Sequence, residues 1–438
     1  MQEDFFSLAD ALTRELRTEE IFTCWFNGER SNFIRFNHGK VRQAGHVRQR
    51  HLDLRLIRDG RQATRSLALT GSADDFFNAK EALAQLRRVI DDLPLDPYLL
   101  FATDVKSSET KRLGKLPNSS QAVEQIIEQA SGLDLVGIYA AGPMFRGFAN
   151  SFGQRNWHEV ENFNFEWSLY HQADKAVKSS YAGFDWKLAE LKQRMELAAD
   201  QLIILQQPAI SIAPGEYRAF LAPRAIEEVI GMLAWGGLSA KARRTKQSPL
   251  IKMEQGAKLN DCVTLRENTA GGTAPAFQRD GFTRPAQVSL VNSGILDEAL
   301  VAPRTAKEYG LVSNGANGSE SPESIELAAG QLDLADALSA LDTGLYINNL
   351  WYLNFSDRPA CRVTGMTRFA TFWVEHGKIV APVNVMRFDD TIYRMLGENL
   401  IDLTHEQDLM LDASTYGSRS TQSAKLPGAL LSGMKFTL

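Results

Sequence analysis

The side chains best suited to bind a metal or to act in catalysis are few and widely spaced in this sequence. Seven histidines are present, but none belongs to an HExxH pattern, and the three cysteines form no CxxC pair. The closest histidines, His46 and His51, are five residues apart in a strand-like segment, which places them on opposite faces. His158 lies beside Glu159, a pairing that is common on protein surfaces. Neither a GxSxG elbow nor a Walker loop occurs. Residue types alone therefore identify no catalytic constellation.

The composition is that of an ordinary globular chain. Its 438 residues, 44% hydrophobic and 23% charged, indicate two or three domains. The net charge of -5 provides no global basic field, so we expect no direct nucleic-acid partner. An odd number of dispersed cysteines indicates a reducing compartment. The acidic start, MQEDFFSLAD, differs from a signal peptide, and no apolar run is long enough to span a membrane. We expect a cytoplasmic protein without membrane contact.

Local patterns predict several elements near the N-terminus. DFFSLADALTREL has the apolar spacing of an amphipathic helix, and HLDLRL alternates as a half-buried strand does. Asp59-Gly60 then predicts a tight hairpin, since both residue types tolerate positive backbone angles. Ser72 is predicted to cap the next helix together with Asp75.

Strands and helices mix along the chain without regular βαβ alternation, which favours an α+β fold with mixed or antiparallel sheets and flanking helices. Polar residues over Lys106–Ser120 predict a mobile loop. The densest strand signal is Gly344–Val383, which closes with a hairpin at His376-Gly377. Three segments are predicted: an N-terminal α+β domain over 1–105, a middle α+β segment over 106–210 that can pack with the first as one N-terminal domain, and a β-rich C-terminal domain over 211–438.

The stretch Glu227–Ala240, EEVIGMLAWGGLSA, predicts a buried helix that runs into a glycine break. It holds no histidine or cysteine and, past Glu228, no acid. The basic run that follows, Ala240–Gln247, is better interpreted as a solvated loop than as a DNA contact, because no aromatic residue or groove-sized helix accompanies it.

Several tracts in a fixed order give the sequence a resemblance to a known family. They are NHGKVRQ, LDLRLIRDGRQ, FANSFGQ, EYRAFLAPRAIEEVI and GLYINNLW…TGMTRFATFWVEHGKIVAPV. Together they resemble the TldD/PmbA (TldE) family, also called modulators of DNA gyrase. The resemblance covers nearly the whole chain, and it implies TldD/PmbA-like N-terminal and C-terminal domains.

The resemblance also implies an activity and a metal site. The family includes cytosolic metallopeptidases that degrade unstructured peptides and mature peptide antibiotics. Its TldD members carry an HExxxH zinc motif on the helix after the strand that matches EYRAFLAP. Matching that strand puts the first histidine on Gly231, the glutamate on Met232 and the second histidine on Gly236. A cysteine ligand near the C-terminus of TldD members has no counterpart in Ser414–Ser423.

These replacements remove the donors that a hydrolytic zinc requires. Zinc needs about three protein ligands, and a catalytic site also needs a base for the bound water. Glycine offers no side-chain atom, and the thioether of methionine is soft and uncharged. The chain therefore resembles the zinc-less PmbA/TldE type. We expect no cofactor and no metal in this chain, with zinc only in a partner subunit.

The leading hypothesis is a non-catalytic partner subunit that acts with a zinc-bearing TldD-like chain in the proteolysis or maturation of unstructured peptides. Open strand edges bind extended peptides through backbone hydrogen bonds. The candidate peptide-binding residues are the aromatic and amide side chains of GLYINNLWYLNF, namely Tyr346, Asn348, Asn349, Trp351 and Tyr352. Each of them, taken singly, also suits a core position.

Two alternatives remain open from the sequence. One is a peptidase or hydrolase with non-zinc chemistry, using Cys361 or a serine with His376. The other is a homodimeric peptide-binding protein without a catalytic partner.

Overall fold

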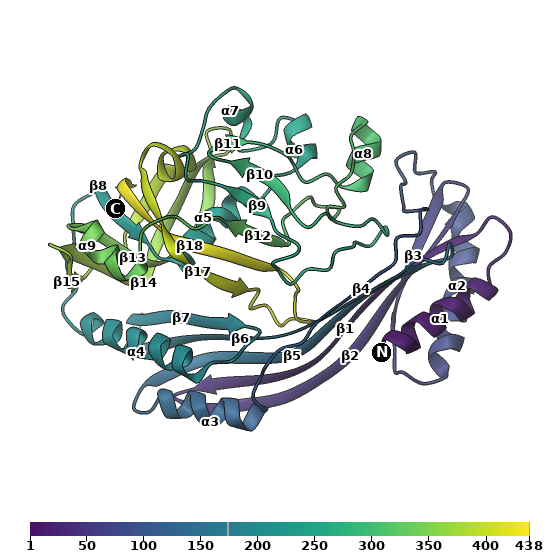
Figure 1. The fold of residues 1–438 in the computed structure, drawn as a ribbon, viewed down its shortest axis with the longest axis horizontal. Coiled ribbons are helices and arrows are strands. Elements are labelled where there is room, and N and C mark those ends of the chain that lie inside the picture. The colour runs from purple at the N-terminus through teal and green to yellow at the C-terminus, as the bar shows by residue number, and fades with distance from the viewer. Residues whose placement is uncertain (173–174, 438) are drawn as a thin grey trace.

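The computed structural model describes residues 1–172 and 175–437, and its strands form two large sheets (Figure 1). The strands of the first sheet are β1 (Ile21–Asn37), β2 (Lys40–Arg58), β3 (Arg61–Ala68), β4 (Ser108–Arg112), β5 (Asp134–Asn150), β6 (Arg155–Gln172) and β7 (Lys175–Gly183). Their order is β3-β2-β1-β5-β6-β4, and β7 also pairs with β6. Strands from residues 1–105 and 106–210 therefore share one sheet, joined where β1 pairs antiparallel with β5.

The predicted mobile loop over Lys106–Ser120 is wrong for part of its length. Ser108–Arg112 forms β4 and pairs in parallel with Asn156–Val160 of β6. Its side chains are largely exposed, so no apolar alternation marks the strand. The backbone pairing at the sheet edge, which a polarity pattern does not encode, fixes this segment.

Four helices cover the first sheet near its two ends (Figure 1). They are α1 (Gln2–Arg14), α2 (Asp74–Val89), α3 (Ser119–Gln129) and α4 (Leu188–Leu205). The first two pack with β1 and β2 around Phe26 and Leu54, and the other two pack on a separate cluster around Phe165. The predicted cap at Ser72 is confirmed only in part: its hydroxyl accepts a hydrogen bond of 3.3 Å from the backbone of Asp74, but Asp75 accepts from the backbone of Thr70 and Gly71 and does not complete the pair.

The second sheet contains the remaining strands. They are β8 (Gly215–Leu221), β9 (Leu265–Glu267), β10 (Val288–Asn292), β11 (Ile295–Leu296), β12 (Ser324–Leu327), β13 (Gly344–Asp357), β14 (Arg362–Glu375), β15 (Lys378–Pro382), β16 (Arg387–Thr391), β17 (Leu400–Leu411) and β18 (Ser423–Phe436). Pairings β8-β13-β14-β16-β18 return to β8, so five strands close on themselves. The predicted α+β class with mixed and antiparallel sheets is confirmed.

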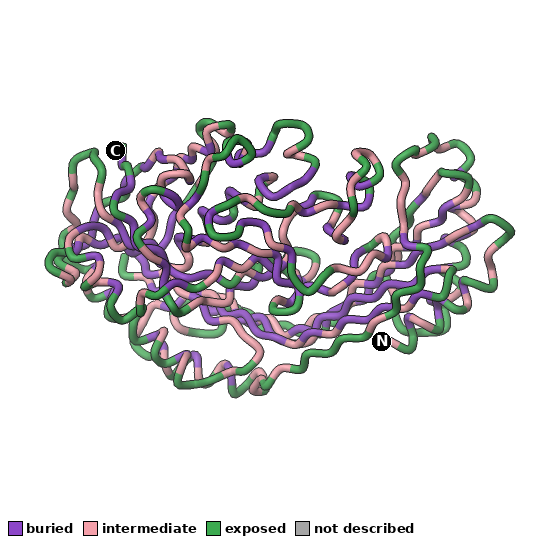
Figure 2. The backbone as a smooth tube through the Cα atoms, turned by 45° about the horizontal axis from the view of Figure 1, so that its top comes forward, coloured by how far each residue is buried: buried purple, intermediate pink, exposed green. Residues whose placement is uncertain are grey.

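Short helices accompany the second sheet. They are α5 (Pro223–Ala234), α6 (Ala240–Arg244), α7 (Ile251–Glu254), α8 (Pro303–Tyr309), α9 (Ala337–Leu341), the 3-10 turn Leu334–Asp336 and the π-helical turn Arg394–Glu398, while a further 3-10 turn, Ile90–Asp92, follows α2. Helix α5 contributes Ile226, Val229 and Leu233 to the main core of this part of the molecule. Figure 2 shows the buried positions running along the long strands, with exposed ones on loops and outer helix faces.

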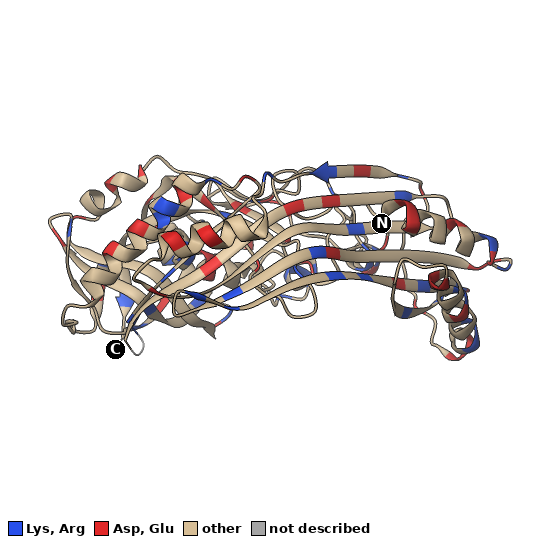
Figure 3. Cartoon of the chain, turned by 90° about the horizontal axis from the view of Figure 1, so that it is seen from below, with Lys and Arg blue, Asp and Glu red and all other residues tan. Residues whose placement is uncertain are grey.

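Both predicted hairpins are confirmed. Asp59-Gly60 joins β2 to β3 with φ of +48° and +71°, and His376-Gly377 joins β14 to β15 with φ of +50° and +72°. Along the long strands, basic and acidic positions are interspersed (Figure 3). No helix in the described part of the chain has the length and apolarity needed to cross a bilayer.

Candidate functional site

Helix α5 is the element on which the sequence places the altered zinc motif. Strand β8 ends at Leu221, Ala222 takes an extended conformation, and Pro223 begins the helix with its φ already suited to the first turn. The helix ends at Ala234, and Gly236 follows with φ of +81°, a conformation that favours glycine. The predicted helix with a glycine break is confirmed.

The three positions of the altered motif do not share one face of α5. Gly231 is exposed, and a Cβ built there would meet no atom within 4 Å. Met232 points into the core and is 6% exposed. Gly236 lies beyond the last helical turn, where a Cβ would approach Nη2 of Arg358 to 2.7 Å. These positions offer no nitrogen or oxygen side-chain donor, so they do not fit a zinc ion.

Charged side chains occupy the outer face of α5 beside the first sheet. Arg224, which is 13% exposed, donates a hydrogen bond of 2.5 Å to Glu227 and another hydrogen bond to Glu166 of β6. The ammonium group of Lys178 on β7 lies 3.9 Å from Glu166. Burial alone would lower the pKa of Arg224, but Glu227 and Glu166 outweigh this effect and raise it. The cation on this face is thus a fixed guanidinium that ties α5 to the first sheet.

Elsewhere in residues 1–172 and 175–437, one group of three side chains has metal-ligand spacing. It consists of Asp333, His405 and Glu406, whose ligand atoms lie within 4.8 Å of one another and which are all exposed. Oε2 of Glu406 already accepts a hydrogen bond of 2.8 Å from the backbone of Leu334. This group lies outside α5 and is not part of the altered motif.

The five candidate peptide-binding residues fall into two groups. Tyr346 is half-buried and its ring stacks on Phe220, with the centroids 5.5 Å apart. Asn348 donates a hydrogen bond of 3.0 Å to the carbonyl of Lys178, which links β13 to β7. Asn349 is 6% exposed. Tyr346 and Asn348 therefore make contacts within the structure, and Asn349 is buried.

Trp351 and Tyr352 form the second group and lie at the surface. They are 44% and 73% exposed, with ring centroids 5.5 Å apart. A bulge between Trp351 and Asn354 gives Tyr352 a φ of +57° and turns these rings outward. Only these two of the five are available to a ligand.

The segment Ser414–Ser423, where TldD members carry a cysteine, contributes a buried arginine that the sequence analysis missed. Arg419 is 5% exposed and donates hydrogen bonds to the carbonyl of Gly142, at 3.0 Å, and to the side chain of Asn162. Its own carbonyl accepts a hydrogen bond of 3.2 Å from Arg146. Burial lowers the pKa of Arg146 and of Arg419 to about 10, and nearby Glu29 opposes this effect. A run of small polar residues around one arginine was the available signal.

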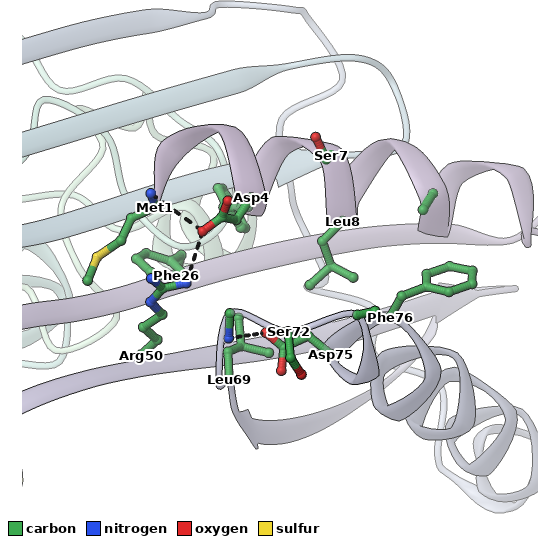
Figure 4. Close-up of a pocket in the computed structure, with 14 residues that line it drawn as sticks. Met1, Asp4, Ser7, Leu8, Phe26, Arg50, Leu69, Ser72, Asp75 and Phe76 are labelled. Atoms are coloured by element: carbon green, nitrogen blue, oxygen red, sulfur yellow. Dashed lines mark hydrogen bonds and ion pairs between the residues drawn. The ribbon is translucent and has the colours of Figure 1, made fainter.

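A pocket of about 260 Å³ lies between α1 and α2, at the opposite end of the first sheet from α5 (Figures 1 and 4). Its buried cation, Arg50, donates a hydrogen bond of 3.0 Å to Asp4. The carboxylate of Asp75 accepts hydrogen bonds from the backbone N–H groups of Thr70 and Gly71. Because Arg50 and Asp75 are paired within the chain, neither charge is left free to recognise a ligand.

The chain has an α+β fold with two large sheets, and helix α5 follows directly after β8. Several solved structures share this fold. TldE from Thermococcus kodakarensis is 15% identical and superposes with a TM-score of 0.78 over 99% of this chain and 100% of that chain. A protein from Thermotoga maritima, named as a modulator of a DNA gyrase, is 14% identical, with a TM-score of 0.77 and full coverage of both chains. Another so named, from Bacteroides thetaiotaomicron, is 14% identical, with a TM-score of 0.74 and coverage of 99% and 98%. At these identities the likeness concerns the fold.

The sequence itself establishes the family. The family described as PmbA/TldA metallopeptidase C-terminal domain matches residues 214–438, and the chain belongs to this family. The predicted membership in the TldD/PmbA family is confirmed. No curated protein matches the sequence.

Proposed function

We propose that this chain is a zinc-less member of its metallopeptidase family that acts as the partner subunit of a zinc-bearing relative in the processing of unstructured peptides. The observation that carries the proposal is the set of residues at the motif positions in and just after α5. Where the family's motif would place histidine, glutamate and histidine, this chain has Gly231, Met232 and Gly236, and Met232 points into the core. A hydrolytic zinc needs about three protein ligands and a base, and these positions supply neither.

The non-zinc hydrolase alternative receives no support from the residues it would use. Cys361 is fully buried, and burial raises its pKa to about 12, so the thiolate that a nucleophile requires is disfavoured. His376 lies in an exposed hairpin turn, 3.9 Å from Asp342 and in a different element from Cys361.

The surface aromatics of β13 support the peptide-handling part of the proposal. Trp351 and Tyr352 offer exposed ring faces, and Arg368 lies 4.4 Å from the ring centroid of Trp351. Aromatic rings contact extended peptide of any sequence, because they need no matching hydrogen-bond pattern. Cytoplasmic location and pairing with a second subunit belong to the same proposal.

Co-purification with a zinc-bearing relative tests the proposal. The tagged chain is expressed in its native cytosol, and the bound proteins are identified by mass spectrometry. We expect a relative that carries HExxxH, and we expect the pair to cleave an unstructured peptide until a chelator is added. The chain alone should not cleave it. Chelator-sensitive cleavage by the isolated chain, or recovery of only a second copy of itself, would contradict the proposal.

A further inference from the structure

An arginine at the C-terminal end of α5 is held in place without a carboxylate partner. Arg358 donates a hydrogen bond of 2.6 Å to the carbonyl of Trp235 and one of 3.0 Å to the carbonyl of Gln247. Its guanidinium carbon lies 5.4 Å from the ring centroid of Trp235 and 4.8 Å from that of Phe355. Within the described residues, no carboxylate oxygen lies within 4.0 Å of this guanidinium. The group is therefore pre-positioned and electrostatically uncompensated.

A cavity of about 550 Å³ is lined by further positively charged side chains. Arg243, Arg244 and Lys246 line it, with Glu254 as its acidic lining residue. Arg243 donates hydrogen bonds of 3.1 and 2.7 Å to the carbonyls of residues 297 and 298 rather than to a carboxylate. In the part of the chain that the structure describes, none of the three cations forms an ion pair.

Apolar side chains also line this cavity. They are Val301, Leu311 and Val312, and Val312 is 89% exposed. Arg358 donates to the carbonyl of Gln247, the residue after Lys246, which places this arginine near the cavity. We call these neighbouring groups the basic rim, defined by Trp235, Arg244, Lys246, Phe355 and Arg358 together with the cavity.

The chemistry of the basic rim selects a ligand with carboxylates and apolar side chains. Unpaired cations attract anionic groups, and a guanidinium held by two carbonyls and lying beside two rings loses little freedom on accepting a carboxylate. The apolar side chains of the cavity suit an apolar side chain of a ligand better than a phosphate. We propose that the basic rim binds acidic segments of unstructured peptides in extended form. This inference rests on the proposed function, since it names the substrate class that the subunit would present.

Fluorescence anisotropy on the isolated chain tests the inference. The probe is a fluorescein-labelled, unstructured peptide of Glu, Gly and Leu, and the matched probe has Gln in place of Glu. We expect the acidic probe to bind about tenfold more tightly, with an affinity that falls as salt is added. The double variant Arg244→Glu/Lys246→Glu should weaken binding of the acidic probe about tenfold, and Trp235→Ala should weaken it about threefold.

The matched control is Arg42→Glu/Arg65→Glu, which makes the same charge change at exposed positions of the first sheet. It should change the affinity less than about twofold. Equal binding of the two probes, no binding at all, or equal effects of the two double variants would overturn the inference. Tighter binding of a single-stranded oligonucleotide, lost in the Arg244/Lys246 variant, would also overturn it. These titrations need no second subunit, so their outcome does not depend on the co-purification. A failure of the peptide-binding inference can therefore be distinguished from a failure of the proposed function.

Discussion

Two arginines stand at opposite ends of helix α5, and they differ in what balances their charge. Arg224 in the first turn is 13% exposed and pairs with Glu227 and with Glu166 of the first sheet. Arg358 beside the last turn is bound to two backbone carbonyls and two aromatic rings, with no ion pair in the described chain. The N-terminal end of α5 is therefore a contact between the two sheets, which we call the seam. The C-terminal end of α5 lies at the surface.

This difference distinguishes a charged side chain that stabilises the fold from one that is free to bind a ligand. A buried arginine whose carboxylates are supplied by the chain contributes to stability, and its removal leaves other charges unpaired. An arginine without such partners contributes little to stability and can bind an external anion. Replacements on the seam should therefore change the free energy of unfolding, and replacements on the basic rim should change binding.

The largest effect is expected inside the altered motif itself. Met232→Glu places a carboxylate in the core, where the native side chain is 6% exposed. We expect the free energy of unfolding to fall by about 4 kcal/mol, as measured by urea denaturation. The neighbouring Gly231→Glu, at a position with open space around it, should change it by less than about 1 kcal/mol. Equal losses in the two variants would mean that the motif positions are not divided between core and surface.

The next effect compares the two arginines directly. Arg224→Met leaves Glu166, which is 14% exposed, with only Lys178 nearby at 3.9 Å. This should lower the free energy of unfolding by about 3 kcal/mol. Arg358→Met should lower it by about 1 kcal/mol or less, since it removes only contacts at an exposed helix end. A larger loss of stability in Arg358→Met than in Arg224→Met would mean that Arg358, and not Arg224, is the structural arginine.

A buried histidine at another contact between the first sheet and the C-terminal part gives the stability of the chain a pH dependence. His158 contacts Thr110 Oγ1 at 2.8 Å and the carbonyl of Thr273 at 3.0 Å. Burial lowers its pKa to about 4 from an ordinary value of 6.5, which the hydrogen bond to Thr273 opposes. Between these values the unfolded chain binds a proton that the folded chain does not.

Stability from His158 is therefore fully present above pH 6.5 and is lost as the pH falls towards 4. The loss should reach about 3 kcal/mol, measured by urea unfolding across this range. In His158→Gln the dependence should flatten, whereas the exposed His376→Gln should leave it unchanged. An equally steep pH dependence of the free energy of unfolding in His158→Gln would show that this histidine does not cause it.

The smallest effect is expected at the aromatic part of the basic rim. Trp235 is 59% exposed, so Trp235→Ala should lower the free energy of unfolding by less than about 1 kcal/mol. Trp167→Ala, at a side chain that is 2% exposed, should lower it by about 4 kcal/mol. Thermal unfolding of both variants measures the contrast. A comparable loss at Trp235 would show that this ring is a core element.

Local signals predicted much of the fold. Asp59-Gly60 and His376-Gly377 identified their hairpins because two-residue turns require specific backbone angles, and the apolar period of α5 with its glycine break identified the helix. Strand β4 was missed because its residues are exposed and its pairing with β6 is set by a distant part of the chain.

The site was only partly predictable. The altered motif at Gly231, Met232 and Gly236 could be located in the sequence, but its division between surface and core could not. Glu166 lies 58 residues from Arg224, and the Trp235 carbonyl lies 123 residues from Arg358, and such distant pairings leave no local pattern. Arg419, buried against the first sheet, was missed for the same reason.

The metal content of the purified chain tests the central claim most directly. Protein expressed with added zinc and then desalted should contain no stoichiometric zinc by mass spectrometry, both in the native chain and in a His405→Ala variant that disables the exposed Asp333, His405 and Glu406 group. Zinc lost on His405→Ala would assign it to that exposed group and leave α5 without metal. A stoichiometric zinc ion retained in His405→Ala would contradict the account.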